Sequence, residues 1–198
     1  GLTNASRGNN KGTITNNGEV YLSVNSGTIH ANGQSSTLVN NNAESSVNGT
    51  IVITNLDESR GNATVTGTKG YIAQEIKAET SVQDIDTRAN AVWLSAKLNI
   101  DVTDADGAYT PVNKSGLTVI ATGADAEIYG HDQRFRIEAL GVNAGASLYL
   151  THVTVVLNET TVAMNGIAGN PATLQVNSNA SLTADSGDPT VANDGVIN

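Results

Sequence analysis

Acidic side chains spaced two residues apart come nearest to a catalytic arrangement in this sequence. The pairs are Asp84 with Asp86, Asp104 with Asp106, and Asp125 with Glu127. Two carboxyl groups at a suitable separation hydrolyse a glycosidic bond, one as the acid and the other as the base or nucleophile. Residues two apart on a strand also point to one face, so an ordinary polar face produces the same spacing. We favour the polar face, and a carbohydrate-active enzyme stays the alternative.

The stretch TDADGAY, residues 103–109, partly matches the calcium-binding loop of EF-hand proteins. Asp104 and Asp106 fit the middle of that pattern, where side-chain oxygens bind the ion. However, Val102 stands where the first acidic ligand belongs, and Asn113 stands where the bidentate glutamate belongs. We therefore interpret the stretch as an Asp-rich turn, with these two aspartates as the metal-ligand candidates of the chain and no metal expected.

The three histidines, His30, His131 and His152, are far apart in the sequence and show no spacing typical of metal ligands. No nucleophile elbow, phosphate loop or dinucleotide-binding fingerprint occurs either. We therefore expect neither a metal ion nor a cofactor.

The stretch GHDQRFR gathers three basic side chains on an acidic protein: His131, Arg134 and Arg136. Local pairing with Asp132 and Glu138 would account for them without any function. The alternative is that they bind an acidic glycan or a carboxylate of a partner protein, because charged donors make strong hydrogen bonds to carboxylates. Both interpretations stay open, and the three are candidate ligand-binding residues.

The composition favours short strands and turns over helices. Of the 198 residues, 38% are hydrophobic but only 4% are aromatic, so we expect a thin, aliphatic interior. Asn, Thr, Ser and Gly supply the polar character, because charged residues make up only 15% against roughly 25% in an average domain. The formal net charge of −9 argues against binding nucleic acid or anionic lipid. No run of about 18 apolar residues is present to cross a membrane.

A Gly-x-Ile step from turn to strand recurs along the chain, at Gly12–Ile14, Gly27–Ile29, Gly49–Ile51 and Gly195–Ile197. In the second half, LTVIATGADAEI (117–128) resembles LQVNSNASL (174–182), and GASLYL (145–150) resembles NASL (179–182). The spacing is irregular but lies near 20 residues, which is within the range of solenoid repeats.

An L-x-L-x-x-V-x-V pattern predicts two short strands with inward side chains, joined by a two-residue corner. It consists of Leu148, Leu150, Val153 and Val155, with His152 in the corner. Short strands joined by turns that bend the same way build the coils of a parallel β-helix, which stack about 4.8 Å apart. We therefore predict an all-β parallel β-helix, or solenoid, with an antiparallel β-sandwich as the alternative.

Residues 69–114 carry much of the charge and break the repeat. We interpret them as a central insertion or an enlarged coil, set between coils in 1–68 and 115–198 of a single β-helix domain. Within this region NAVWLSAKLNIDV, residues 90–102, is expected to form one long strand, and YIAQEIKAET, residues 71–80, a turn of helix.

Trp93 and Lys97 lie on the polar face of the expected long strand, opposite its aliphatic residues. We expect Trp93 to pack with Tyr71 or Tyr109 in a small second core of the insertion. Because its charges and aromatic rings interrupt a repetitive surface, we also expect the insertion to carry the specific ligand contact, with Trp93 and Lys97 as candidate binding residues.

The stretches NNGEVYLSVNSGTI, LQVNSNASLTADSG and ANDGVIN, with the absence of Cys and the acidic balance, resemble the passenger domain of bacterial autotransporter adhesins. The resemblance implies a right-handed parallel β-helix that is exported across the outer membrane to the bacterial cell surface. It also implies adhesion without catalysis, to the same module on neighbouring cells in a biofilm, or to a host matrix protein or glycan. A carbohydrate-active β-helix enzyme or phage tailspike-like fragment is one alternative, and a purely structural stalk is another.

Overall fold

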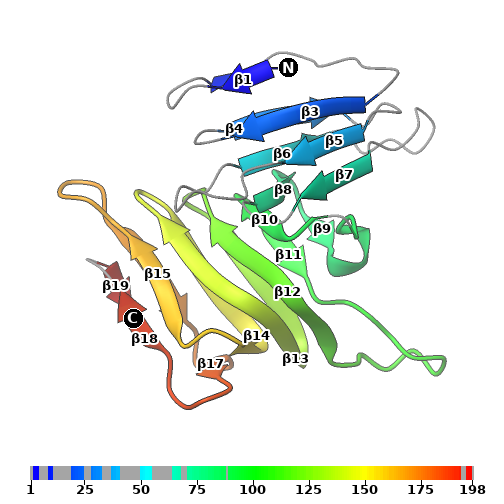
Figure 1. Cartoon of the computed structure of the whole chain (residues 1–198). Helices are drawn as coiled ribbons and strands as arrows, with labels where there is room; N and C mark the ends of the chain where they lie inside the picture. Colours follow the sequence, from blue (N-terminus) through cyan, green and yellow to red (C-terminus); the bar gives the residue numbers. More distant parts are fainter. Residues whose placement is uncertain are drawn as a thin grey trace. The chain divides into compact units, whose positions relative to one another are not determined.

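The computed structural model describes residues 73–87 and 89–190 with their side chains, and only the strands within 1–72 and 191–198. The chain divides into two compact units. Unit 1 comprises Gly1–Glu75 and Asp86–Asn90, and unit 2 comprises Ile76–Ile85 and Ala91–Asn198. Each unit is a stack of parallel strands (Figure 1).

Unit 1 alternates between two series of parallel strands. One series contains β1 (Leu2–Asn4), β3 (Glu19–Val24), β5 (Thr37–Asn40) and β7 (Thr64–Gly67). The other contains β2 (Asn9–Asn10), β4 (Thr28–Asn32), β6 (Thr50–Thr54) and β8 (Tyr71–Ile76). Because the chain returns to the same series after every second strand, it forms a solenoid with two strands per turn.

The Gly-x-Ile echoes of unit 1 mark equivalent positions in successive coils. Ile29 of β4 pairs in register with Ile51 of β6, and Thr28 pairs with Thr50. The prediction of a solenoid from these echoes is confirmed there. Gly12–Ile14 lies outside the described residues, and of His30 only the backbone is described.

Unit 2 has three series of parallel strands, named here after one strand of each. The β10 face contains β10 (Ala91–Leu94), the ends of β12 (Val112–Ala121) and β13 (Ala126–Asn143), β15 (Thr161–Asn165) and β18 (Thr190–Ala192). The β11 face contains β9 (Thr80–Ser81), β11 (Lys97–Asn99), the starts of β13 and β14 (Ser147–Leu157), β16 (Ala172–Val176) and β19 (Gly195–Ile197). The β17 face contains the start of β12, the middle of β13, the end of β14, and β17 (Ser181–Ala184).

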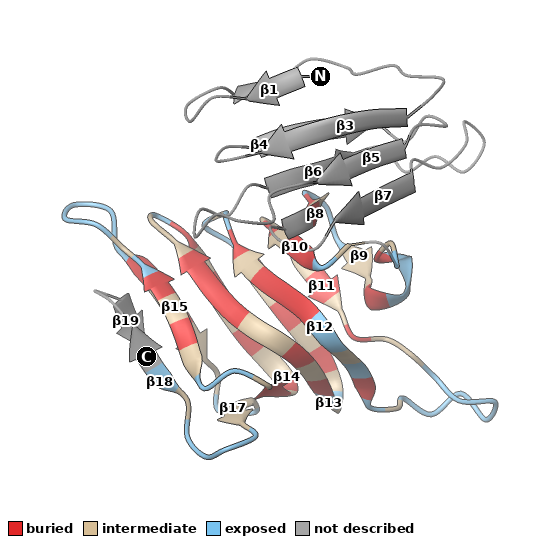
Figure 2. Cartoon of the chain, viewed as in Figure 1, coloured by how far each residue is buried: buried red, intermediate tan, exposed pale blue. Residues whose placement is uncertain are grey.

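The interior of unit 2 is aliphatic, as the composition predicts. Figure 2 shows buried bands along β12, β13 and β14. The L-x-L-x-x-V-x-V pattern is confirmed, because Leu148, Leu150, Val153 and Val155 are all at most 1% exposed. Leu148, Leu150 and Val155 have aliphatic register partners in the next coil, namely Leu174, Val176 and Leu182. Phe135, the single Phe, is fully buried in the same interior.

The expected long strand over residues 90–102 is wrong in length. Four of its six expected inward positions are confirmed, since Val92, Leu94, Leu98 and Ile100 are fully buried, whereas Ala96 and Val102 are only half-buried. However, the chain turns at Ser95, so that β10 pairs with β12 while β11 pairs with β13 on another face. Apolar and polar residue types continue to alternate through this turn, which is why the sequence pattern does not reveal it.

The range expected for the insertion, residues 69–114, includes residues that belong to regular coils, because β10 and β11 pair in parallel with β12 and β13. The residues that enlarge a coil are 101–111, between the β11 and β17 faces. There the backbone of Thr103 forms an antiparallel bridge with Tyr109. The expected helical turn at residues 71–80 is also wrong, because Tyr71–Ile76 is strand β8.

Helical structure in the described part of the chain is a single 3-10 turn, η2 (Val82–Asp84), whose N-terminus is capped by Ser81. None of the described helical structure is long and apolar enough to span a membrane. The echoes of the second half do not mark equivalent positions. Leu148 lies on the β11 face, whereas Leu182, its counterpart in NASL, lies on the β17 face.

Candidate functional site: the histidine corner

The corner between the β11 face and the β17 face carries most of the unusual side chains of unit 2. In four successive coils it consists of residues 101–111, residues 130–132, His152, and residues 177–180. We call these residues the histidine corner. Its length differs between coils. Three residues, 130–132, lie between Tyr129 and Gln133, whereas His152 alone lies between their register partners Thr151 and Val153 in the next coil.

Three residues of the histidine corner have a left-handed backbone. The φ angles are 49° at His131, 64° at Asp132 and 49° at His152, and no other non-glycine residue in the described ranges has a positive φ. Gly or Asn adopts this conformation at lower cost. Non-glycine residues held there cost on the order of 1 kcal/mol each and cluster at functional sites. Among non-glycine residues, Asn, Asp and His are found most often in this region, so these three residues are compatible with the turns they make.

Aromatic rings from different coils contact one another at the corner. The rings of Tyr109 and His131 are stacked, with 3.8 Å between centroids and 8° between planes. Tyr129, the last outward residue of its strand on the β11 face, meets His131 edge to face at 4.8 Å. The same Tyr129 ring lies 5.5 Å from the ring of His152 in the next coil. Stacked and edge-to-face pairs are the arrangements that aromatic rings prefer.

Polar contacts continue this row of rings towards the C-terminus. His152 Nδ1 lies 2.7 Å from the carboxylate of Asp132, one coil before it. The backbone N–H of His152 donates to Asn179 Oδ1 at 3.2 Å, one coil after it. Asn177 Nδ2 likewise donates to the hydroxyl of Thr151 at 2.9 Å. The corner is thus held from coil to coil by side chains that reach across the stack.

Lys97 borders the ring cluster on the β11 face. Its ammonium lies 5.6 Å from the centroid of Tyr129, which is within cation–π range. It also lies 3.3 Å from the carboxylate of Glu79, and Asn99 donates a hydrogen bond to the same carboxylate. The hydrogen bond from Asn99 and the contact with Lys97 lower the pKa of Glu79 below its ordinary value.

The ring of Tyr129 connects two of the ligand-binding residues expected from the sequence, since Lys97 and His131 both lie against it. Trp93 lies elsewhere, half-buried on the outer side of the β10 face, where its register partner is Ile120. The expected packing of Trp93 with Tyr109 is not found, because the Tyr109 ring stacks on His131 instead.

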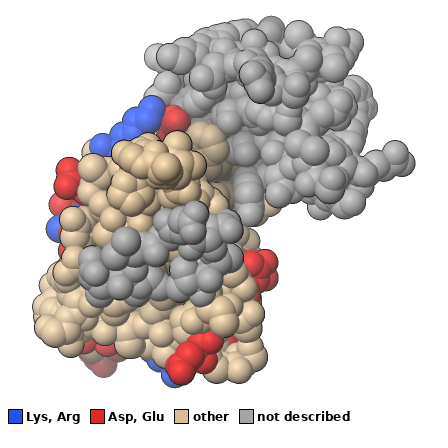
Figure 3. Space-filling model, turned by 90° about the vertical axis from the view of Figure 1, so that its left-hand side faces the viewer, with Lys and Arg blue, Asp and Glu red and all other residues tan. Residues whose placement is uncertain are grey.

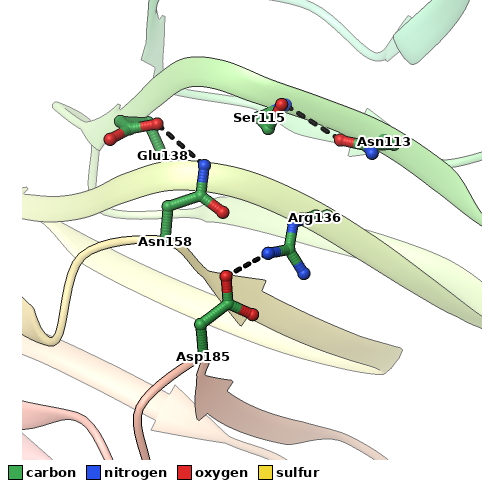
Figure 4. Close-up of polar contacts among 6 residues, drawn as sticks. All are labelled: Asn113, Ser115, Arg136, Glu138, Asn158 and Asp185. Carbon is green, nitrogen blue, oxygen red and sulfur yellow. Dashed lines mark hydrogen bonds and ion pairs between the residues drawn. The ribbon is translucent and has the colours of Figure 1, made fainter.

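The two arginines of the stretch GHDQRFR have different environments. Arg136 forms an ion pair with Asp185 (Figure 4). Local pairing with Asp132 and Glu138 is therefore wrong for Arg136: the first carboxylate binds His152, and the second accepts a hydrogen bond from Asn158. Arg134 is exposed and makes no ion pair with any residue that the structure describes.

Asp104 and Asp106 lie in the loop 101–111, where Asp104 forms a turn. Its carboxylate accepts hydrogen bonds from the backbone N–H groups of Asp106 at 2.9 Å and Ala108 at 3.0 Å. Gly107 completes the turn with a φ of 80°. In the part of the chain with described side chains, no group of three or more His, Asp or Glu is placed to hold a metal ion.

The other paired carboxylates are spread over different elements. Asp84 ends the 3-10 turn, Asp125 is exposed in a turn, and Glu127 lies on the β11 face between its register partners Lys97 and Tyr149. In Figure 3, uncharged side chains form most of the described surface in view, with the charged ones towards its margins.

Sequence reasoning missed Tyr109, Tyr129 and the full role of His152. One signal was present: His152 occupies a corner position between two inward-facing pairs of aliphatic residues, where Gly or Asn suits the backbone better. The rings themselves share no local pattern, because they come from different coils, as Tyr129 and His152 do.

Comparison with known proteins returned no match: no family model, no curated protein and no solved structure matches this chain. The solenoid of parallel strands that the resemblance to autotransporter passengers implies is present in both units. The chemistry of the histidine corner is the basis for a functional proposal.

Proposed function

We propose that this chain is a non-catalytic adhesive module of the bacterial cell surface, of the autotransporter-passenger type, and that it binds through the histidine corner. The observation that supports this most is the row of rings formed by Tyr109, His131, Tyr129 and His152 across successive coils. Tyrosine is enriched at binding surfaces because its ring offers apolar area and its hydroxyl a polar contact.

Binding is favoured over catalysis by how the carboxylates of the corner are used. Asp132 contacts the imidazole of His152, and Glu79 contacts both Lys97 and Asn99. These contacts hold side chains of neighbouring coils in fixed positions. A surface fixed in this way loses little conformational entropy when a partner binds, which increases affinity.

The partner is a second copy of the module on a neighbouring cell, or a host matrix protein or glycan. The rings of the histidine corner come from three successive coils, so a partner that lies along the stack makes several weak contacts rather than one strong contact. Adhesion then gains from the display of many copies on one cell, because linked weak contacts raise the overall affinity.

Beads coated with the purified chain test this proposal. Bead-to-bead aggregation and the capture of beads on surfaces coated with collagen, fibronectin or mucin are measured. Tyr109→Ala combined with Lys97→Ala is compared with Ile167→Ala, which truncates an exposed apolar side chain (63% exposed) outside the corner. Loss of a central aromatic contact costs about 2 kcal/mol in binding, which is roughly a 30-fold loss of affinity.

The adhesive proposal requires the intact chain to aggregate or to bind at least one of these surfaces, and the corner variant to lose that binding while Ile167→Ala keeps it. Absence of any binding refutes the proposal. Binding that survives in the corner variant places the contact elsewhere in the chain and refutes the role of the histidine corner. New reducing ends or unsaturated sugars, after incubation with polysaccharides, would instead indicate the enzyme.

A further inference from the structure

Tyr109 presents one face of its ring to solvent and has the other face covered. His131 covers the inner face, at 3.8 Å between centroids and nearly parallel. The side chain is nevertheless 42% exposed, and Tyr109 and Ile167 are the exposed large apolar residues among those described. One broad, flat apolar surface therefore remains open at the histidine corner.

The backbone around Tyr109 is also held in place. Its antiparallel bridge to Thr103 closes the loop, and the N–H of Thr110 donates to the carbonyl of Val102 at 2.9 Å. The carboxylate of Asp104 fixes the tip of the loop through its two backbone hydrogen bonds. An aromatic ring fixed in this way binds a flat ligand without first losing freedom of its own.

We propose that the open face of Tyr109 is a binding platform for the sugar ring of a neutral glycan. This inference rests on the proposed adhesive function and names its ligand. A pyranose ring has a flat face of C–H groups and a rim of hydroxyls, so it requires one apolar plane bordered by hydrogen-bonding groups. The histidine corner supplies the plane in the open face of Tyr109, and exposed polar residues of the same loop, Thr103 and Asp106, supply the border.

Asp132 directly follows His131, whose ring stacks on Tyr109, and its carboxylate is a hydrogen-bond acceptor at the histidine corner. One carboxylate oxygen contacts His152, and no described residue contacts the other, while the side chain is 73% exposed. A free carboxylate oxygen accepts a hydrogen bond from a sugar hydroxyl. It repels a second carboxylate, as does the net charge of −9 on the chain. These charges favour a neutral glycan over the acidic glycan considered from the sequence, particularly because Arg136 is already paired with Asp185.

The same charges disfavour nucleobases as ligands of the ring, since they are attached to phosphate. If the ligand were an aromatic side chain of a partner protein, we would expect large apolar residues to surround the Tyr109 ring. The exposed neighbours of Tyr109 in its loop instead include no large apolar side chain: they are the polar Thr103, Asp104 and Asp106, the small Ala105, Gly107 and Ala108, and Pro111. An isolated ring with a polar border suits a sugar.

Affinity electrophoresis tests the platform directly. The intact chain is run in native gels that contain hydroxyethylcellulose, galactomannan or polygalacturonate, at a series of concentrations. We expect at least one of the two neutral polysaccharides to retard the chain more strongly than polygalacturonate does. Tyr109→Ala is expected to weaken this binding at least tenfold. Tyr109→Phe, which keeps the ring, is expected to stay within about threefold of the intact chain.

Ile167→Ala is the matched control, because it removes an exposed apolar side chain that is no part of the platform. It is expected to leave the retardation unchanged. Circular dichroism of each variant establishes that the loop substitution has not unfolded the solenoid.

Absence of retardation by every polysaccharide overturns the inference, as does stronger retardation by polygalacturonate or unchanged binding by Tyr109→Ala. If the beads still adhere to protein-coated surfaces or to one another in that case, the adhesive function stands and only the sugar ligand is wrong. If the beads adhere to nothing, the adhesive function fails as well.

Discussion

Replacing Leu150 with Ala tests whether the aliphatic stack inside unit 2 holds its coils together. Leu150 is fully buried, and its register partners are Ile128 in the coil before and Val176 in the coil after. The substitution removes three carbons from the interior. At about 0.8 kcal/mol for each buried carbon, the transfer term alone is roughly 2.4 kcal/mol.

The space left by the missing carbons adds to this cost. The strands above and below are held about 4.8 Å apart by backbone hydrogen bonds, so the coils cannot close over the gap. We therefore expect a total loss of about 3–4 kcal/mol in the free energy of unfolding, within the usual range for Leu→Ala. Thr154 lies on the outer side of the same strand, where its hydroxyl accepts a hydrogen bond from Ser181 at 3.1 Å. Thr154→Ala is expected to cost only about 0.5–1 kcal/mol.

Urea unfolding of both variants gives the measurement. Trp93 is the single Trp and belongs to unit 2, so its fluorescence reports on that unit. With a slope of about 2 kcal/mol/M, Leu150→Ala lowers the midpoint by roughly 1.5–2 M and Thr154→Ala by less than about 0.5 M. Equal shifts for the two variants, at unchanged slope, would refute the inward and outward assignment of β14.

Three further substitutions test the corners and the charged contacts. Gly130→Ala is expected to cost about 1–3 kcal/mol in urea unfolding, because a Cβ there would lie 2.5 Å from a side chain of the next coil, whereas Gly116→Ala, with nothing within 4 Å, is the tolerated control. Glu79 has a lowered pKa, so the stability it contributes is present above its ordinary value of 4.5 and is lost as the pH falls through the lowered pKa. The stability difference between the intact chain and Glu79→Gln should then shrink on acidification, and a constant difference from pH 7 to pH 3 would contradict this. Arg136→Ala, which breaks the ion pair of Figure 4, should cost at most about 1 kcal/mol, more than Arg134→Ala, and a larger loss from Arg134→Ala would be inconsistent with the pairing.

Several elements were predictable because their signal is local. Alternation of apolar and polar residues with period two gives the inward positions of β14, and it also gives Val92 and Leu94 in β10 correctly. The Gly-x-Ile steps give the pairing of β4 with β6, because Thr28 and Ile29 begin β4 as Thr50 and Ile51 begin β6. In both cases neighbouring residues carry the whole pattern.

Other features were not predictable from local patterns. The corner at Ser95 was missed because apolar and polar residue types alternate without a break from β10 to β11. A turn that preserves this alternation cannot be seen in the sequence pattern. The echo between GASLYL and NASL placed Leu148 and Leu182 at equivalent positions, although they lie on different faces. Every face of the solenoid selects the same small aliphatic residues, so similar segments need not occupy the same face.

By itself, the amino-acid sequence indicated short strands around a thin aliphatic interior, since those preferences act between residues two apart, while its repeats favoured a parallel solenoid and left the antiparallel sandwich as an alternative. Only the tertiary structure decided which outward side chains meet. Tyr109, His131 and His152 come together because a long loop, a three-residue corner and a one-residue corner lie on successive coils of one stack. That alignment depends on the register between coils, which hydrogen bonds and packing set along the entire strands. The histidine corner is therefore a property of the stacked coils and of no single stretch of the sequence.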